Sequence, residues 1–266
     1  MRIGCQIGMW RTGDVEAAIS AIGAAGAQGI ETFAAQLKTY HEDPAKLQAL
    51  LDAANLRLSG AYFNSSEFVN PAAEDDVVNE AAADCDLLRA VGGGFLVVNG
   101  GVPKGDPPRT FSDEEFAQLA KVLNRIGAAA AQRGVQAVTH PHVRCMIETP
   151  ADVDRLVAAG VDQKRIGLCV HASHQLLAGA DPYAIYEKHP AWVRYAHIGD
   201  TGEDGKGAFL GQGVLDQERL MRPLLEAGFD GWIVIECGKE GTPPAEYAAN
   251  AIACMKRTWP QVNWEA

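Results

Sequence analysis

The sequence predicts an α/β fold, a single (β/α)8 barrel spanning residues 1–266, and three observations support this fold class. Eight short apolar runs recur along the chain and alternate with segments of helical apolar spacing. The runs 95–98 (FLVV) and 232–235 (WIVI) are apolar at successive positions, which is typical of parallel strands buried on both faces. A length of 266 residues with 47% hydrophobic content is sufficient for one barrel domain.

The eight predicted strands are, in chain order, RIGCQIG, GIETF, LRLSGAYF, FLVVNG, VQAVTH, IGLCVH, VRYAHIG and WIVIE. Residues that favour a left-handed conformation precede most of them and predict where the preceding helix ends. These predicted helix stops are Gly26, Asn55, Gly92, Gly134, Gly160 and Gly228. Capping side chains and prolines predict where helices begin, because they satisfy or replace free N–H groups of the first turn. The predicted starts are Asp43-Pro44, Ser112 to Glu115, Thr149-Pro150 and Asp181-Pro182.

An open, doubly wound sheet is the alternative fold. That fold usually carries a GxGxxG phosphate loop after its first strand, and no such motif follows the first strand here. The segments richest in Gly, Pro and Asp, residues 99–110 and 199–213, both follow predicted strands. In a barrel they would lie at the C-terminal ends of the strands, where active sites form.

The charge balance disfavours some classes of partner. With 34 acidic residues against 23 Lys and Arg, the net charge of -11 makes nucleic acid and anionic membranes poor partners. No segment approaches the roughly 20 apolar residues of a membrane span, and no leader peptide is evident, so we expect a cytoplasmic protein. The six cysteines show no CxxC pairing, and we expect reduced, mostly buried thiols.

Three imidazoles and one carboxylate lie at or near the C-terminal ends of the last four predicted strands. They are His140, His171, His197 and Glu236. Parallel strands of one barrel bring these ends to a common mouth, so the four side chains are expected to converge on one divalent metal ion. A histidine at a strand end is by itself more often a hydrogen-bonded core or loop residue. The combination of all four predicts a metal-dependent enzyme.

The stretches that carry these residues, THPHV, VHASH, HIGD and IEC, resemble the xylose isomerase-like barrel family of sugar phosphate isomerases and epimerases. GAQGIETF, LAGADP and FLGQGVLD extend the resemblance over nearly the whole chain, and HPH followed by IET is most similar to the inosose dehydratase branch.

His197 and Glu236 match family ligands directly. His140 and His171 stand where the family has Glu and Asp. The nitrogen-rich set favours Mn²⁺, Co²⁺, Fe²⁺, Ni²⁺ or Zn²⁺ over Mg²⁺.

The resemblance implies proton abstraction next to the carbonyl of a keto-sugar or keto-polyol, through an enediolate. Glu236 is the predicted base. His174, in the place of the family's motif histidine, is expected to contact a substrate oxygen or act as an acid, with a loop histidine bonded to backbone as the alternative. Glu148 is the second candidate acid or base, although a solvated residue at a helix N-terminus fits equally well. Asp200 is expected to support a ligand.

Residues near the early strand ends are predicted to bind the substrate, because polyols require a stacking face and several hydrogen-bonding groups. These predicted contacts are Trp10, Tyr62, Asn64 and Asn99, with His142 after the fifth strand. Each fits a core or turn position equally well. Glu31, near the end of the second strand, is expected to be an inward structural carboxylate. No phosphate-cradling motif is evident, so an unphosphorylated substrate is favoured.

Isomerase or epimerase activity and dehydratase or lyase activity are both consistent with these residues, the second because only Glu236 remains as a carboxylate ligand. A phosphodiesterase like the apurinic endonucleases would need a basic surface, which the acidic chain disfavours. A non-catalytic sugar-binding barrel is the alternative outside enzymology. By analogy with the family, a homodimer or homotetramer is expected.

Overall fold

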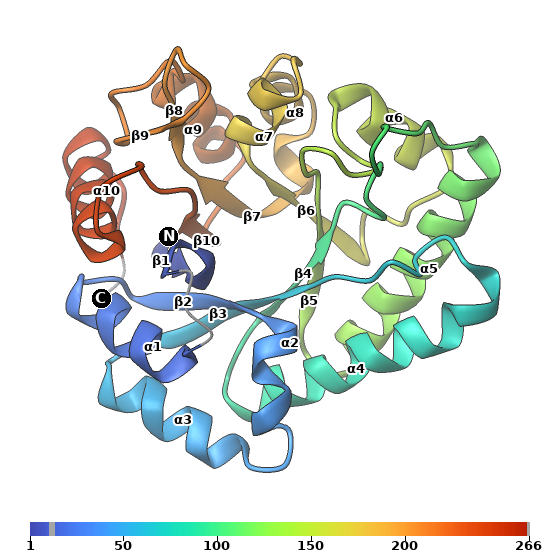
Figure 1. Cartoon of the computed structure of the whole chain (residues 1–266), viewed down its shortest axis with the longest axis horizontal. Helices are drawn as coiled ribbons and strands as arrows, with labels where there is room; N and C mark the ends of the chain where they lie inside the picture. Colours follow the sequence, from blue (N-terminus) through green and yellow to red (C-terminus); the bar gives the residue numbers. More distant parts are fainter. Residues whose placement is uncertain (11–13, 265–266) are drawn as a thin grey trace.

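Eight parallel strands form a closed barrel, as predicted (Figure 1). The structure is a computed structural model and describes residues 1–10 and 14–264. The strands follow one another around the barrel in chain order, and β1 closes it by pairing with β10. They are β1 (Arg2–Gln6), β2 (Gly29–Phe33), β3 (Arg57–Phe63), β4 (Phe95–Asn99), β5 (Gln136–His140), β6 (Ile166–Val170), β7 (Val193–Ile198) and β10 (Trp232–Ile235).

Helices surround the barrel and connect its strands (Figure 1). The longer ones are α1 (Val15–Ala24), α3 (Pro44–Ala53), α4 (Glu74–Ala90), α5 (Asp113–Gln132), α6 (Pro150–Ala158), α9 (Gln217–Glu226) and α10 (Pro244–Thr258). The short ones are η1 (Ile7–Trp10), α2 (Ala34–Leu37), η2 (Lys38–Tyr40), η3 (Pro71–Ala73), α7 (Ala172–Leu177), α8 (Ala184–Lys188) and η4 (Pro190–Trp192).

The predicted helix ends and starts depend on local chemistry, and most are confirmed. All six predicted stop residues have positive φ, including the one non-glycine, Asn55, at 53°. Ser112 and Thr149 each form a reciprocal capping box at the starts of α5 and α6, and Asp43 caps α3. The predicted start at Asp181-Pro182 is early. The Asp181 carboxylate accepts a hydrogen bond from the Tyr183 N–H at 2.9 Å, which forms a turn, and α8 begins at Ala184.

Two apolar layers hold the barrel together. The inner layer fills the barrel and comes from six consecutive strands, β3 to β7 and β10. Its residues are Tyr62, Val97, Val138, Cys169, Tyr195, Trp232 and Val234. The outer layer is larger and joins strand residues such as Ile30 and Leu168 with helix residues such as Leu47 and Leu123 in one buried cluster. Strands buried on both faces explain the uninterrupted apolar runs of the sequence.

The loop at 199–213 contains an element that the sequence did not predict. A short antiparallel hairpin, β8 (Asp200–Thr201) and β9 (Gly207–Ala208), projects from the C-terminal end of β7. The buried Asp200 carboxylate holds it in place by accepting hydrogen bonds from the backbone N–H groups of Thr201, Gly211, Gly213 and Leu215. Asp200 therefore organises this loop instead of supporting a metal ligand, which corrects the sequence-based expectation.

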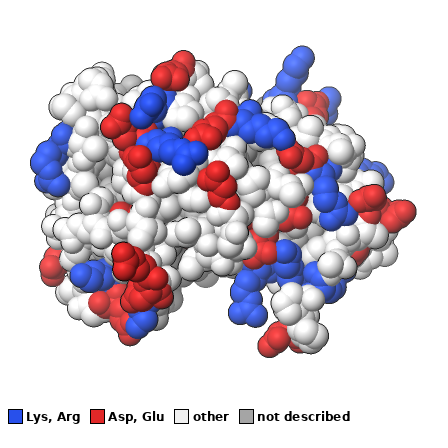
Figure 2. Space-filling view, turned by 90° about the horizontal axis from the view of Figure 1, so that it is seen from above, with Lys and Arg blue, Asp and Glu red and all other residues white. Residues whose placement is uncertain are grey.

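Basic and acidic side chains are mixed over the surface. Figure 2 shows one face, on which Lys and Arg lie among Asp and Glu, consistent with the many ion pairs such as Lys188–Asp154 and Arg219–Glu187. All six cysteines are free thiols, and four of them are buried. None of the described helices has the length and apolar character needed to cross a lipid bilayer.

Candidate metal centre

The four predicted ligands meet at the C-terminal end of the barrel. One ligand atom from each of His140, His171, His197 and Glu236 lies within 4.8 Å of every other. The three histidines are buried, and the Glu236 side chain is 18% exposed. His140 ends β5, His171 follows β6, His197 lies in β7 and Glu236 follows β10. Closure of the barrel thus assembles side chains that are up to 96 residues apart in the sequence, from 140 to 236.

Backbone contacts next to these residues explain the local geometry. The Glu236 N–H donates to the Ile198 carbonyl at 2.9 Å, which extends the β10–β7 pairing one residue beyond the strand. Gly199 follows Ile198, and a Cβ at this glycine would lie 2.6 Å from the Glu236 carbonyl oxygen. Only glycine therefore allows the backbones after β7 and β10 to approach closely enough for His197 and Glu236 to share one centre.

The chemistry of the four ligand atoms fits a metal ion. His140 Nε2, His171 Nδ1, His197 Nδ1 and Glu236 Oε2 are all buried and lack a hydrogen-bond partner among the described residues. His171 Nδ1 and His197 Nδ1 lie 3.0 and 2.7 Å from Glu236 Oε2, yet neither contact has hydrogen-bond geometry. Their residues each bring one ligand atom to within 4.8 Å of the others. Burying them would be costly without a partner, and a divalent cation supplies one.

Outer contacts orient two of the rings. His197 Nε2 lies 2.9 Å from Oε2 of the fully buried Glu31 on β2, and His140 Nδ1 lies 3.3 Å from the Cys169 carbonyl. When these nitrogens donate their protons to the two acceptors, the opposite nitrogen of each ring presents its lone pair to the centre. Glu31 is thus the inward structural carboxylate that the sequence predicted.

Burial and neighbouring charges set the protonation of the ligands. Burial lowers the pKa of His140 well below its ordinary value, and it also lowers the pKa of His171 although Glu236 opposes the change. Both rings are therefore neutral, as ligation requires. Burial would raise the pKa of Glu236, but His197 and His171 hold it well below its usual range. Burial would lower the pKa of His197, but Cys169, Glu31 and Glu236 together raise it. Metal binding would release that proton.

Two further predicted histidines lie beside the centre. The ring of His174, on α7, is centred 4.3 Å from that of His171 and 5.3 Å from that of His140. Both of its nitrogens are buried and without a hydrogen-bond partner among the described residues. His142 follows the end of β5 in a loop, its Nδ1 is 2.7 Å from the Val143 carbonyl, and its ring is centred 4.0 Å from that of His174.

Glu148 belongs to the loop that follows β5. Its Oε1 accepts a hydrogen bond from the Arg144 N–H at 2.6 Å, and its Oε2 pairs with Lys104 of the loop after β4. Oε1 therefore stabilises the loop after β5, and Oε2 joins it to the loop after β4. Glu148 is not one of the four converging residues. Its predicted catalytic role stays a prediction.

The predicted substrate-binding residues occupy two places. Hydrogen bonds link Tyr62, Asn99 and Asn64. The buried Tyr62 hydroxyl donates to Oδ1 of the buried Asn99 at 2.7 Å, and Asn99 Nδ2 donates to Oδ1 of the exposed Asn64 at 3.2 Å. The Tyr62 ring also meets the His140 ring edge-on, with centroids 5.8 Å apart. Trp10 lies elsewhere, in the wall of a cavity at the barrel mouth.

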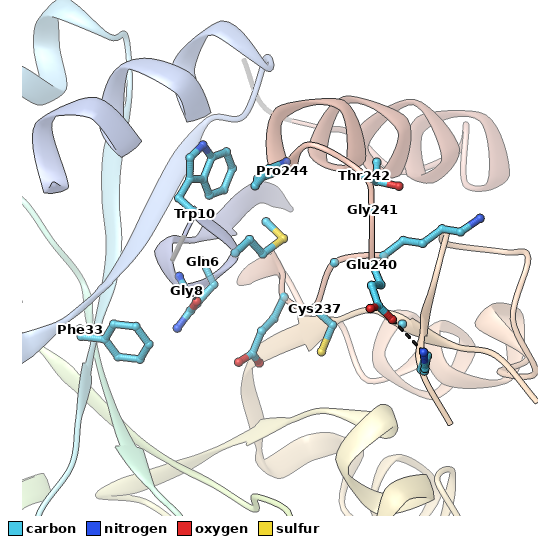
Figure 3. A pocket seen from close by; sticks show the side chains of 15 residues that line it. Gln6, Gly8, Trp10, Phe33, Cys237, Glu240, Gly241, Thr242 and Pro244 are labelled. Atoms are coloured by element: carbon cyan, nitrogen blue, oxygen red, sulfur yellow. Dashed lines mark hydrogen bonds and ion pairs between the residues drawn. The ribbon is translucent and has the colours of Figure 1, made fainter. Parts of the chain in front are cut away.

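This cavity has a volume of about 790 Å³, and the Glu236 side chain lines it. Figure 3 shows Trp10 and Phe33 on one side and Cys237 and Glu240 on the other. Lys206 Nζ and Glu240 Oε2 form an ion pair at 2.8 Å, so this lysine is neutralised by a neighbour. Glu236 therefore connects the candidate metal centre to a space large enough for a sugar-sized molecule.

Sequence reasoning missed Gln6, Phe33 and Cys237 as cavity residues. Gln6 and Phe33 are the last residues of β1 and β2, so the rule that located the metal ligands, the C-terminal end of a strand, was available for them too. Cys237 has an unusual backbone, with φ of 70°, and its Sγ lies 3.8 Å from His171 Nε2. Nothing in the sequence signals that conformation.

Comparisons with known proteins agree with this architecture. A profile of the xylose isomerase-like TIM barrel family matches residues 19–258. A protein named inosose dehydratase from Bacillus licheniformis is 30% identical, with 90% of this chain and 86% of that protein covered. Another of the same name from Lacticaseibacillus casei is 28% identical, with 91% and 89% covered.

Solved structures share the fold. A crystal structure of the IOLI protein with a bound zinc atom has a TM-score of 0.79 at 16% identity, covering 98% of this chain and 99% of that one. D-Psicose 3-epimerase from Clostridium cellulolyticum, solved with D-tagatose, also has a TM-score of 0.79, at 15% identity and with 97% and 99% covered.

Proposed function

Because this chain belongs to the xylose isomerase-like TIM barrel family, we propose that it is a metal-dependent enzyme that removes a proton next to the carbonyl of a keto-sugar or keto-polyol. The observation that carries this proposal is the set of four buried, unpaired ligand atoms beside a cavity of about 790 Å³. His140, His171, His197 and Glu236 would hold one divalent cation. When bound, the cation would act as a Lewis acid that polarises the substrate carbonyl.

Glu236 is the proposed base. Its Oε2 lies 3.0 Å from His171 Nδ1 and 2.7 Å from His197 Nδ1, while the side chain as a whole keeps 18% exposure and lines the cavity. Its second oxygen, Oε1, is therefore available to accept the proton from the carbon next to the carbonyl. The low pKa that His197 and His171 impose keeps Glu236 ionised, so it is ready to accept that proton near neutral pH.

His174 is the proposed hydrogen-bonding group or acid. Two buried nitrogens without partners among the described residues would be satisfied by substrate oxygens. In the simplest reaction, the proton held by Glu236 returns to the neighbouring carbon, and the product is an isomer. Tyr62, Asn64, Asn99, His142 and Trp10 would bind hydroxyl groups or the apolar face of the substrate.

Dehydration is the second candidate, and two observations favour it. The curated relatives at 28% and 30% identity carry the name inosose dehydratase. Glu236 is also the one carboxylate in the ligand set, and His140 occupies the position where a second base would be needed for epimerisation. In this reaction Glu236 takes the α-proton, the carbon–carbon double bond forms, and the β-hydroxyl leaves as water with that same proton. Burial and the neighbouring His171 lower the pKa of His174 well below its ordinary value, so His174 would be neutral and would donate a hydrogen bond to the departing hydroxyl.

The test is incubation of metal-loaded protein in D₂O with 2-keto-inositol and a panel of keto-hexoses, followed by mass spectrometry. Deuterium incorporation without mass loss indicates isomerisation, whereas loss of one water indicates dehydration. Glu236→Gln is expected to abolish either signal, and His189→Asn, at a histidine outside the centre, should retain it. Binding of a sugar without exchange or water loss would indicate the non-catalytic alternative and refute the proposed enzyme.

The three imidazoles favour a transition metal over Mg²⁺, so Mn²⁺, Co²⁺, Fe²⁺, Ni²⁺ and Zn²⁺ are the proposed ions. We also propose that the substrate carries no phosphate. The Lys206–Glu240 ion pair supports this, because Glu240 neutralises a cation of the cavity wall that could otherwise bind a phosphate group. A homo-oligomer, a cytoplasmic location and the absence of a nucleic-acid partner stay predictions.

A further inference from the structure

A second cavity lies at the opposite, N-terminal end of the barrel and has a volume of about 570 Å³. Arg2, Arg57 and Trp232, which are the first residues of β1, β3 and β10, line it together with Lys256 of α10 and Trp264. The metal ligands lie at the other ends of the strands. The cavity is therefore separate from the site described above.

The cations of this cavity are unpaired. Arg2, Arg57 and Lys256 form no ion pair with any residue that the structure describes, although most other Lys and Arg side chains of this acidic protein do so. The one carboxylate in the wall, Asp52, accepts a hydrogen bond from Gln48 at 2.7 Å. Positive charge in a concave, partly enclosed space attracts an anion more strongly than the same charge on an open surface.

Several side chains of the wall carry donors that no described acceptor uses. Arg2 Nε and Trp264 Nε1 are buried and have no acceptor within the described residues. Gln28 Oε1 accepts a hydrogen bond from the Ile3 N–H at 2.7 Å, which leaves its NH₂ group as a further donor. These donors belong to residues of the cavity wall, so the wall carries donor capacity that no described acceptor uses.

Aromatic packing holds one of the cations in position. The Arg2 guanidinium lies 4.8 Å from the centroid of the Trp232 ring. The Trp232 ring packs directly against Gly29, since a Cβ at Gly29 would lie 2.6 Å from two atoms of the ring. The ring therefore has little freedom to move. An arginine fixed in this way presents its fork of N–H groups with less loss of entropy on binding.

We propose that this cavity binds a phosphate group, either free inorganic phosphate or the phosphate of a small phosphorylated metabolite. A phosphate offers several acceptor oxygens and pairs with guanidinium groups through two parallel hydrogen bonds. The volume exceeds that of phosphate alone, so the organic part of a metabolite would fit beside Trp264. The proposal concerns a site remote from the metal centre and does not depend on the proposed reaction.

Isothermal titration of the metal-loaded protein with inorganic phosphate, at constant ionic strength, tests this proposal. We expect saturable binding at one site, equally in wild type and in His171→Ala, because the metal centre is not involved. Arg2→Gln is expected to weaken binding at least tenfold, and Lys256→Gln several-fold. Arg257→Gln is the matched control, since Arg257 is exposed on the same helix but does not line the cavity.

A parallel titration with glucose 6-phosphate distinguishes the two sources of phosphate. Tighter binding than inorganic phosphate indicates a phosphorylated metabolite, and equal or weaker binding indicates free phosphate. The proposal is wrong if wild type shows no saturable binding, if binding survives in both Arg2→Gln and Lys256→Gln, or if it vanishes in His171→Ala. Thermal unfolding of each variant establishes that it folds.

Discussion

Glu31 on β2 lies 2.9 Å from His197 on β7, and neither side chain has exposed surface. The two strands are not neighbours in the barrel, since β1 and β10 lie between them. The contact therefore crosses the barrel interior and links a carboxylate near the start of the chain to a metal ligand 166 residues later.

Glu31→Gln is expected to weaken metal binding about 10- to 100-fold, because removing the carboxylate removes the acceptor that orients His197 and increases its basicity. Competition with a chelator of known affinity measures the change. Glu42→Gln, an exposed carboxylate on the loop before α3, is the matched control and should bind metal as wild type does. Unchanged affinity in Glu31→Gln would show that His197 does not depend on this contact.

His171→Ala should lose the metal. Protein purified without added metal is expected to contain close to one transition-metal ion per chain, and the variant should contain much less, since one of four ligand atoms is absent. Elemental analysis by mass spectrometry gives the ratio. His189→Ala keeps the four ligands and should keep the metal. Stoichiometric metal in His171→Ala, or none in wild type, would contradict the centre.

His174→Asn separates binding of the metal from catalysis. His174 is not one of the four converging residues, but its unpaired nitrogens lie beside them. We expect the variant to retain the metal while kcat falls about 100-fold or more, as for loss of an acid or of a substrate contact. Metal content and steady-state rates with the substrate found above provide the two readouts. Loss of metal would make His174 a ligand instead.

Asp84 gives the protein a pH-dependent stability that is independent of the metal centre. This buried carboxyl of α4 lies 3.1 Å from His41 Nε2 without hydrogen-bond geometry, and its Oδ2 has no partner among the described residues. Burial raises the pKa of Asp84 from 3.8 to about 6, and the negative charge of Glu80 adds to the increase. His41 and Lys38 oppose it, because both favour the ionised carboxylate. The folded protein therefore binds this proton more tightly than the unfolded chain does.

The free energy of unfolding should consequently fall as the pH rises from about 4 through about 6. A shift of roughly two pKa units corresponds to a loss of at most about 3 kcal/mol in this free energy. Asp84→Asn removes the cost of ionising this group, so the variant should be more stable than wild type at pH 7.5 and lose that advantage near pH 4. Urea unfolding at both values measures this. Asp76→Asn, exposed on the same helix, should show no comparable pH-dependent gain.

Much of the fold was readable from local signals. Positive φ at Gly92 and Gly160, and the capping boxes at Ser112 and Thr149, depend on neighbouring residues only, so the sequence indicated where these helices end and begin. The hairpin of Asp200–Thr201 with Gly207–Ala208 was missed. It depends on one buried carboxylate that accepts hydrogen bonds from residues up to Leu215, and that pattern has no local signature.

The sequence by itself determined that eight parallel strands alternate with helices and that His140, His171, His197 and Glu236 stand at or near their C-terminal ends, because apolar periodicity and capping are properties of the chain alone. Only the tertiary structure decided which nitrogen of the His197 and His140 rings faces the centre, since that depends on Glu31 and on the Cys169 carbonyl. Only closure of the barrel brought Arg2, Arg57 and Lys256 around one cavity at its other end, because these residues share no pattern in the sequence and meet through strand pairing and helix packing.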